Sequence, residues 1–344
     1  GKALSGDTIQ ALYQLIETGD LDEVSTPAQR QKNGNMLEKY IDRIVSDIQL
    51  KKPLKIVIDC GNGIAGCIAT TLYKALGCEV IELFCKVDGN FPNHHPDPSQ
   101  DENLQDLIAA VKSEQADIGL AFDGDADRLG VVTGSGKVIW PDRQLILFAK
   151  DVLSRYPGGE IIYDVKCTRY VPRLIKQFGG KPTICATGHS LVKTKLRETN
   201  ALLAGEFSDH LFFKERWYGF DDGLYAGARL LEILANNTKN IDELFSEIPD
   251  CVNTPELKIA IDDHEKFAFI KKLVEQAHFK GGEINTLDGL RVDFDKGFGL
   301  VRCSNTTPCL VCRFEADDAA TLEVIKTAFK VQLLAVDPTL DLPF

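Results

Sequence analysis

The sequence predicts an α/β protein: two tandem mixed-sheet α/β domains of related plan, followed by a smaller C-terminal α+β domain. Three observations lead to this prediction. Strand-like apolar runs alternate with helical patterns from about residue 54 to residue 235, which is typical of largely parallel sheets. The strand, loop and helix of residues 54–77 recur at residues 160–178. From residue 256 the order changes to strand, helix, several strands and a final helix.

The length and composition agree with a folded protein of several domains. The chain has 344 residues, of which 44% are hydrophobic. Its formal net charge of −12 opposes binding to nucleic acid or to an anionic membrane. The sequence contains no apolar run of transmembrane length and no signal-peptide core. We therefore expect a cytoplasmic monomer that binds neither nucleic acid nor membranes.

The ten cysteines predict reduced thiols packed among apolar residues, because no secretory signal accompanies them. Cys309 and Cys312 form a C-x-x-C motif within a strand-like run. A spacing of three on a strand points two side chains to opposite faces. We therefore do not expect these two cysteines to form a zinc site or a redox pair.

The N-terminal residues predict an amphipathic helix and a linker. Apolar residues recur at helical spacing within residues 4–17, and Ser5 is a candidate N-cap. Residues 18–36 are polar and irregular, and a second helical pattern covers residues 37–48. We interpret the first 36 residues as a remnant of an upstream domain and its linker. The predicted domains that follow are residues 37–138, 139–250 and 251–344.

A glycine motif follows the first strand of the first complete domain. Residues 54–59 run into Gly61, Gly63 and Gly66, and Glu82 lies about twenty residues further on a second strand. This spacing matches the dinucleotide-binding fingerprint, so an NAD-dependent dehydrogenase is one alternative. The other alternative is a glycine-rich turn of the kind found in any α/β unit.

Three carboxylates alternate between two apolar runs, residues 118–121 and 129–132. Asp123, Asp125 and Asp127 would repel one another if no cation bound them. Three oxygen ligands without a nearby His or Cys suit Mg²⁺. An EF-hand calcium loop does not fit, because Arg128 and Gly134 replace its glycine and its glutamate. A solvated acidic turn remains the alternative.

Polar segments follow three further strands, where ligands of parallel sheets collect. Lys166 follows the strand that ends at residue 165, and the next two strands end before Thr187-Gly188-His189 and Gly205-Glu206-Phe207-Ser208-Asp209-His210. A later loop places Arg302 beside Ser304, Asn305 and Thr306. An arginine can bind a phosphate through two hydrogen bonds, although Ser, Asn and Thr are also ordinary turn residues.

The segment Asp123-Gly124-Asp125-Ala126-Asp127-Arg128 precedes these polar segments. The order and spacing of all of them resemble those of the α-D-phosphohexomutases, and the chain is most similar to the phosphomannomutase/phosphoglucomutase branch of that family. The resemblance covers nearly all 344 residues. It implies a four-domain enzyme that moves phosphate between O1 and O6 of an aldohexose. The reaction would pass through a 1,6-bisphosphate and a phosphoserine of the first domain.

The resemblance also implies residue roles. Asp123, Asp125 and Asp127 would hold Mg²⁺. Arg128 would steady the transferred phosphoryl group, and Lys166 and His189 would serve proton transfer and charge stabilisation. The expected substrate-binding residues are Arg143, Lys166, Thr187, Gly188, His189, Glu206, Ser208, His210, Arg302, Ser304, Asn305 and Thr306.

The implied substrates are mannose and glucose phosphates, with glucose 1,6-bisphosphate or mannose 1,6-bisphosphate as activator.

The sequence departs from the family's pattern at two places. Asp209 occupies a position where the family commonly has a small residue. The family's Ser-His-Asn-Pro loop is not found in the sequence, and His94-His95-Pro96 does not replace it. We therefore expect this chain to lack the phosphoserine and to be inactive by itself. A non-catalytic phosphosugar-binding module is the alternative.

Overall fold

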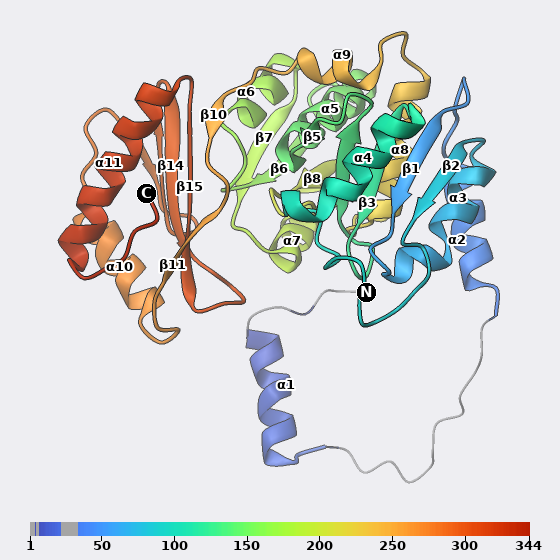
Figure 1. Cartoon of the computed structure of the whole chain (residues 1–344). Coiled ribbons are helices and arrows are strands. Elements are labelled where there is room, and N and C mark those ends of the chain that lie inside the picture. Colours follow the sequence, from blue (N-terminus) through green and yellow to red (C-terminus); the bar gives the residue numbers. More distant parts are fainter. Residues whose placement is uncertain (1–3, 5–6, 22–33) are drawn as a thin grey trace. The chain divides into compact units, whose positions relative to one another are not determined.

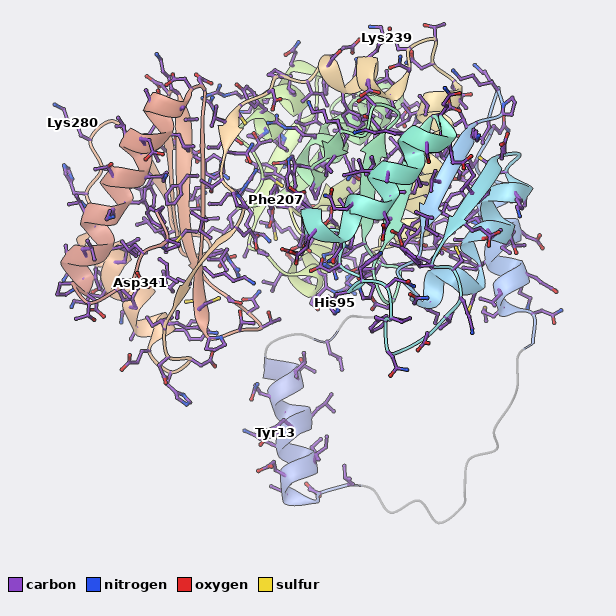
Figure 2. The ribbon with its side chains drawn as sticks, in the orientation of Figure 1. Tyr13, His95, Phe207, Lys239, Lys280 and Asp341 are labelled. Atoms are coloured by element: carbon purple, nitrogen blue, oxygen red, sulfur yellow. The ribbon has the colours of Figure 1, made fainter. Side chains whose placement is uncertain are left out.

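The computed structural model describes residue 4, residues 7–21 and residues 34–344. The predicted Ser5 cap and most of the predicted linker lie outside these residues. Helix α1 spans Asp7–Thr18 and exposes apolar side chains such as Tyr13 (Figure 2). Among the described helices, none combines the length and apolar character that crossing a membrane requires.

The chain divides into two compact units. Unit 1 comprises Gly1–Ile139, His189–Thr199 and Ser208–Glu243, and unit 2 comprises Trp140–Gly188, Asn200–Phe207 and Leu244–Phe344. Each unit therefore combines segments that are distant in sequence.

A five-stranded mixed sheet organises unit 1, in the order β2-β1-β3-β4-β5. Figure 1 shows β1 between β2 and β3. Strand β1 is parallel to both of its neighbours, and β3 and β4 are antiparallel. The carboxyl ends of β1, β2 and β3 consequently lie at one edge of the sheet. The strands are β1 (Lys55–Asp59), β2 (Glu79–Leu83), β3 (Ile118–Phe122), β4 (Leu129–Thr133) and β5 (Val138–Ile139).

Alternation along β3 directs its side chains to two helical layers. Ala121 packs with Leu107 and Val111 of helix α4 (Gln105–Glu114). On the other face, Phe122 stacks on Tyr73 of helix α3 (Ala69–Ala75) at 6.2 Å between ring centroids. The other helices and strand with bounds inside unit 1 are α2 (Met36–Val45), η1 (Ile64–Cys67), η2 (Asp101–Leu104), α7 (His189–Thr199), β9 (Leu211–Phe213) and α8 (Gly223–Ala235).

Unit 2 contains three parallel strands, with β6 between β7 and β8. Asp164 at the end of β6 pairs in register with Cys185 at the end of β7. The carboxyl ends of these strands therefore also share an edge. The elements are α5 (Pro141–Arg155), β6 (Glu160–Asp164), α6 (Tyr170–Gln177), β7 (Lys181–Cys185) and β8 (Leu203–Gly205).

An antiparallel sheet completes unit 2. Helices α10 and α11 pack on one side of it (Figure 1). On that side Phe329 contacts Phe314. Its elements are β10 (Val252–Asn253), β11 (Leu257–Ala260), α10 (Lys266–Gln276), β12 (Glu283–Asn285), β13 (Leu290–Phe294), β14 (Gly297–Cys303), β15 (Cys309–Ala316) and α11 (Ala319–Val336).

The predicted fold class is confirmed, since two mixed or parallel α/β sheets precede an antiparallel α+β part. Several elements differ from the predictions. Helix α1 spans residues 7–18 where 4–17 was predicted, and α2 ends at residue 45 where 48 was predicted. Helix α7 and the short α9 (Ile241–Ser246) were not predicted. His189 is thus the first residue of a helix and not part of a loop.

Candidate functional site

The three predicted metal ligands converge at the carboxyl end of β3. Asp123, Asp125 and Asp127 each offer a carboxylate oxygen within 4.8 Å of the others. The turn between them is closed by the N–H of Ala126, which donates to the carbonyl of Asp123. Ala126 has a left-handed backbone with φ of 65°, and this reversal brings alternate side chains to one point.

Electrostatics at this loop fit a divalent cation. Burial raises the pKa of Asp123 to about 6, against the opposing effect of Arg128. Burial also acts against the charge on Asp127, but its hydrogen bond with His210 keeps its pKa below the usual value. Hard carboxylate oxygens at mutual distances of this size suit Mg²⁺. The donor set therefore agrees with the predicted metal.

Arg128 is held by two carboxylates. Its Nε donates to Asp123 Oδ2 at 2.8 Å, and its Nη1 donates to Asp97 Oδ1 at 2.9 Å. The backbone N–H of Arg128 donates to Asp123 Oδ1. The guanidinium is thus fixed beside the convergent carboxylates, a position suited to an anionic group bound there. The role of Asp97 was not predicted, because it lies in an irregular, proline-rich loop.

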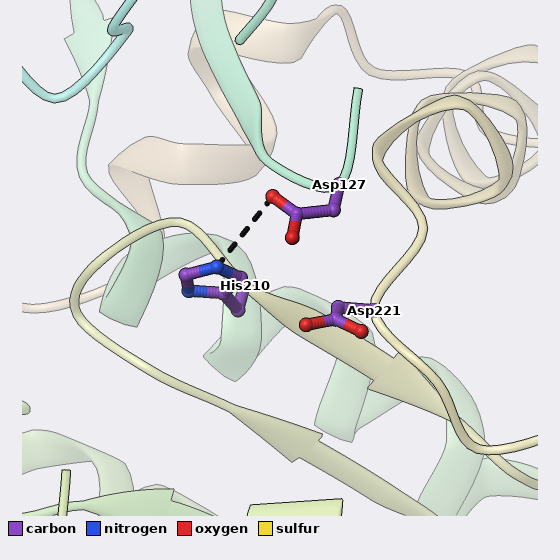
Figure 3. A group of neighbouring side chains, drawn as sticks. All are labelled: Asp127, His210 and Asp221. Carbon is purple, nitrogen blue, oxygen red and sulfur yellow. Dashed lines mark ion pairs between the residues drawn. The ribbon is translucent and has the colours of Figure 1, made fainter. Parts of the chain in front are cut away.

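The two histidines predicted after strand ends lie together in unit 1. Their ring centroids are 5.7 Å apart. His210 Nε2 lies 3.5 Å from Asp127 Oδ1, as Figure 3 shows, and its Nδ1 lies 3.2 Å from Ser208 Oγ. His189 Nδ1 lies 3.3 Å from Asp221 Oδ2. The predicted metal loop and the predicted sugar loop therefore meet at Asp127 and His210.

Asp221 is a further member of this cluster, and no local motif indicated it. Lys193 donates to Asp221 Oδ1 at 2.8 Å, one turn of α7 beyond His189. Asp221, His210 and Asp127 offer ligand-type atoms within 4.8 Å of one another (Figure 3). His189 remains accessible, since 53% of its side chain is exposed. The cluster thus presents an imidazole to solvent next to the carboxylates.

Asp164 organises the strand ends of unit 2. Its carboxylate accepts hydrogen bonds from Thr187 Oγ1 at 2.8 Å and from the N–H of Phe207 at 3.2 Å. Glu206 Oε1 accepts from the N–H of Gly188 at 2.6 Å. The predicted segments after β7 and β8 are therefore joined by two buried carboxylates. Asp164 was missed, although its position at the end of an apolar strand was a signal.

Lys166 is buried beside Glu256. Its Nζ donates to Glu256 Oε1 at 2.8 Å and lies 5.9 Å from the centre of the Phe207 ring, which is labelled in Figure 2. Burial opposes the positive charge, but Glu256 outweighs it, so the pKa of Lys166 is raised. A lysine that stays protonated stabilises negative charge and does not accept a proton. Of the two roles expected for Lys166, this geometry favours charge stabilisation.

The predicted phosphate-binding loop is braced by Asp288. Arg302 Nε donates to Asp288 Oδ2 at 2.9 Å, and the same oxygen accepts from the N–H of Thr187. Asn305 accepts from Arg302 Nη2 and donates to the carbonyl of Thr187. Ser304 Oγ accepts from the N–H of Thr307 at 3.1 Å. Thr187, Arg302 and Asn305 are thus brought together within unit 2.

Arg143 is placed differently from the other substrate-binding candidates. It lies on α5, where its guanidinium donates to the carbonyl of Pro249 at 2.7 Å and to the Cys251 sulfur at 2.9 Å. Only 9% of its surface is exposed. These contacts give Arg143 a structural role in joining α5 to the segment before β10.

Asp209 adopts a left-handed backbone, with φ of 70°. Such a conformation favours glycine, asparagine and aspartate, which explains why a small residue is expected there. Its side chain is buried. Burial alone would lower the pKa of Arg128, but the charges of Asp123, Asp97 and, to a smaller extent, Asp209 outweigh this effect and raise it. The carboxylate of Asp209 therefore adds to the negative charge around Arg128.

The glycine motif serves internal packing. A Cβ on Gly63 would lie 2.9 Å from the carbonyl oxygen of Gly124, and one on Gly66 would lie 2.0 Å from that of Cys85. The last glycine of the motif lies inside the short 3₁₀ helix η1, where a dinucleotide fold has the N-terminus of an α-helix. Close backbone packing therefore explains these glycines without a cofactor.

Comparisons with known proteins show the family of this chain. Family models of phosphoglucomutase/phosphomannomutase match the chain consecutively: α/β/α domain II at residues 38–136, α/β/α domain III at residues 140–251 and the C-terminal domain at residues 256–330. A phosphomannomutase/phosphoglucomutase of Pseudomonas aeruginosa is 56% identical over 344 residues, which are all of this chain and 74% of that protein.

Two other relatives support the same assignment. A phosphoglucomutase of Neisseria gonorrhoeae is 54% identical over 337 residues, covering 96% of this chain and 72% of that protein. The crystal structure of a phosphoglucomutase/phosphomannomutase family protein from Burkholderia thailandensis superposes with a TM-score of 0.94 at 54% identity, over all of this chain and 73% of that one. The chain belongs to the phosphoglucomutase/phosphomannomutase family.

Proposed function

We propose that this chain supplies the metal-binding and hexose-phosphate-binding residues of a phosphohexomutase. The enzyme interconverts hexose 1-phosphate and hexose 6-phosphate of glucose, mannose or both. The observation that carries the proposal is the convergence of Asp123, Asp125 and Asp127 beside the fixed guanidinium of Arg128. Phosphoryl transfer depends mainly on positioning and charge neutralisation, and these residues supply both.

Within unit 1, Arg128 would donate hydrogen bonds to the phosphoryl group that is transferred. Mg²⁺, held by the three aspartates, would supply the positive charge that neutralises its oxygens. His189 and His210 would lie next to the reacting sugar hydroxyl, where an imidazole can donate or accept a proton. Asp221 and Asp127 would hold the two rings in place.

Within unit 2, Arg302, Ser304, Asn305 and Thr306 would hold the phosphate that does not react. Lys166 would add a positive charge, and Thr187 and Gly188 would fix the loop beside it. Glu206 would select sugar hydroxyls, and Ser208 would do so in unit 1. Glucose 1,6-bisphosphate or mannose 1,6-bisphosphate would act as intermediate and activator.

Thermal unfolding in the presence of ligands tests this proposal. A ligand that binds only the folded protein raises the melting temperature. We expect glucose 1-phosphate and mannose 1-phosphate to raise it more than glucose or inorganic phosphate at the same concentration. Arg302→Met should reduce the shift, whereas Arg197→Met, on an exposed turn of α7, should not. A shift with NAD⁺ and none with hexose phosphates would favour the dehydrogenase alternative.

A further inference from the structure

Two cysteines face each other at the edge of the unit 1 sheet. Cys60 directly follows β1, and Cys85 lies two residues beyond β2. Their Sγ atoms are 3.4 Å apart. Phe84 between β2 and Cys85 has a left-handed backbone, with φ of 52°. This reversal directs the Cys85 side chain toward Cys60.

The spacing leaves little movement before a covalent bond can form. A disulfide has an S–S distance of about 2.05 Å, so the two sulfurs need to approach by little more than ~1 Å. The surrounding backbone is already fixed by the N–H of Cys60, which donates to the carbonyl of Leu83, and by that of Asn62, which donates to the carbonyl of Phe84. The two strand ends are therefore preorganised for a cross-link.

The two thiols differ in exposure and acidity. Cys60 is fully buried, whereas Cys85 is partly exposed. The hydrogen bond between them lowers the pKa of the Cys85 thiol and raises that of Cys60. A partly exposed thiol with a lowered pKa is the one that attacks a disulfide in solution. The buried neighbour can then resolve the product.

We propose that Cys60 and Cys85 form a reversible disulfide by exchange with a low-molecular-weight disulfide such as oxidised glutathione. The Cys85 thiolate attacks one sulfur of the small disulfide, which forms a mixed disulfide and releases one small thiolate. The Cys60 thiol then loses its proton to solvent or to that thiolate and attacks the Cys85 sulfur, releasing the second small thiol. The protein pair loses two electrons and two protons, and the small disulfide gains both.

The cross-link joins the two strand ends at a turn that touches the metal loop. The N–H of Ile64 donates to the carbonyl of Gly124 at 3.0 Å, two residues after Asn62. Oxidation therefore fixes a segment packed against residues 123–125 in its present conformation. Because the link also restricts the unfolded chain, we expect oxidised protein to melt several degrees higher than reduced protein.

The test is peptide mapping after oxidation. Native protein is incubated with oxidised glutathione, its remaining thiols are alkylated, and it is digested with trypsin without reductant. Cleavage after Lys55, Lys74 and Lys86 places Cys60 with Cys67 and Cys78 with Cys85. The double variant C67S/C78A therefore leaves one cysteine in each peptide. We expect peptides 56–74 and 75–86 to be linked, and dithiothreitol to separate them.

Controls distinguish this site from general thiol reactivity. Exposed Cys67 of the wild-type chain reports that the reagent is active, since it should acquire glutathione. Cys85→Ser should abolish both the link and the oxidation-dependent rise in melting temperature, whereas Cys67→Ser should keep both. Glutathione on Cys67 without a link between Cys60 and Cys85 would overturn the proposal, as would glutathione remaining on Cys85 with Cys60 still reduced.

Discussion

The ammonium group of Lys166 lies 2.8 Å from Glu256 Oε1, and the lysine is buried. Glu256 precedes β11, ninety residues further along the chain. The pair keeps Lys166 protonated within the strand-end site of unit 2. This relationship favours charge stabilisation as the role of Lys166, and substitutions of the ion pair can test it.

Glu256→Gln should destabilise the protein, because it leaves a buried ammonium group without its carboxylate. We expect a loss of about 1–3 kcal/mol in the free energy of unfolding, below the range for fully buried pairs because the Glu256 side chain is 32% exposed. Urea unfolding measures this value. Glu283→Gln, on an exposed strand position, is the matched control.

The double variant Lys166→Met/Glu256→Gln completes that experiment. Removing both charges should recover part of the lost stability, since a buried ion pair can be replaced by an apolar side chain at little net cost. Equal stability of Glu256→Gln and the wild-type protein would show that the two groups do not interact in solution.

Asp222 should make stability depend on pH. Its carboxylate caps α8 by accepting from the N–H of Tyr225, and it accepts from Tyr40 Oη at 2.7 Å. Burial raises its pKa from 3.8 to about 6 despite these hydrogen bonds. The folded state then binds the proton more tightly than the unfolded state. This contribution is complete below about pH 4 and is lost as the pH rises through about 6.

A shift of this size corresponds to about 3 kcal/mol. Asp222→Asn removes the titrating group and keeps an N-cap side chain. The difference in unfolding free energy between wild type and variant, measured in urea at pH 4 to 7, should therefore fall with increasing pH and level off above 6. A constant difference over this range contradicts the raised pKa.

Turnover should require a phosphoryl carrier that residues 1–344 do not include. The sequence has no Ser-His-Asn-Pro segment, and aspartates that bind a cation are poor nucleophiles. We expect a protein of these residues alone to bind glucose 1-phosphate and to form no glucose 6-phosphate, even with glucose 1,6-bisphosphate. Glucose 6-phosphate dehydrogenase coupling measures the product. Turnover that disappears in Arg128→Gln would show that a group within these residues carries the phosphoryl.

The sequence predicted the strands and the polar segments at their ends well, because both have local signals. Asp123, Asp125 and Asp127 follow an apolar strand at alternate positions, and this pattern alone indicated a shared cation. Thr187 and Arg302 were chosen from separate motifs, and the structure joins them through Asp288. The order of the motifs was therefore informative even though their contacts were not visible.

The acidic partners could not be predicted. Each of these acidic residues lies at least fourteen residues from the basic side chain that it contacts, and each occurs in a segment without a motif. They are Asp97, Asp221, Glu256 and Asp288. Pairing of this kind depends on tertiary contacts, which periodicity does not report. The same reason applies to Arg143, which the resemblance placed among the substrate-binding residues and whose contacts to Pro249 and Cys251 are visible only in the structure.

The glycine motif left two alternatives open for a physical reason. Close backbone approach and a dinucleotide phosphate both require glycine. Only the structure showed that Gly63 packs against Gly124 and Gly66 against Cys85.

Calorimetric titration of Mg²⁺ tests the central claim, that Asp123, Asp125 and Asp127 form a cation site. Asp125 is exposed, so Asp125→Asn removes one ligand with little effect on folding. We predict weak binding by the wild-type chain and at least a roughly tenfold higher Kd in Asp125→Asn, whereas Asp101→Asn, at an exposed position of η2, leaves Kd unchanged. The same Kd in Asp125→Asn as in wild type would contradict the assignment of the metal to this loop.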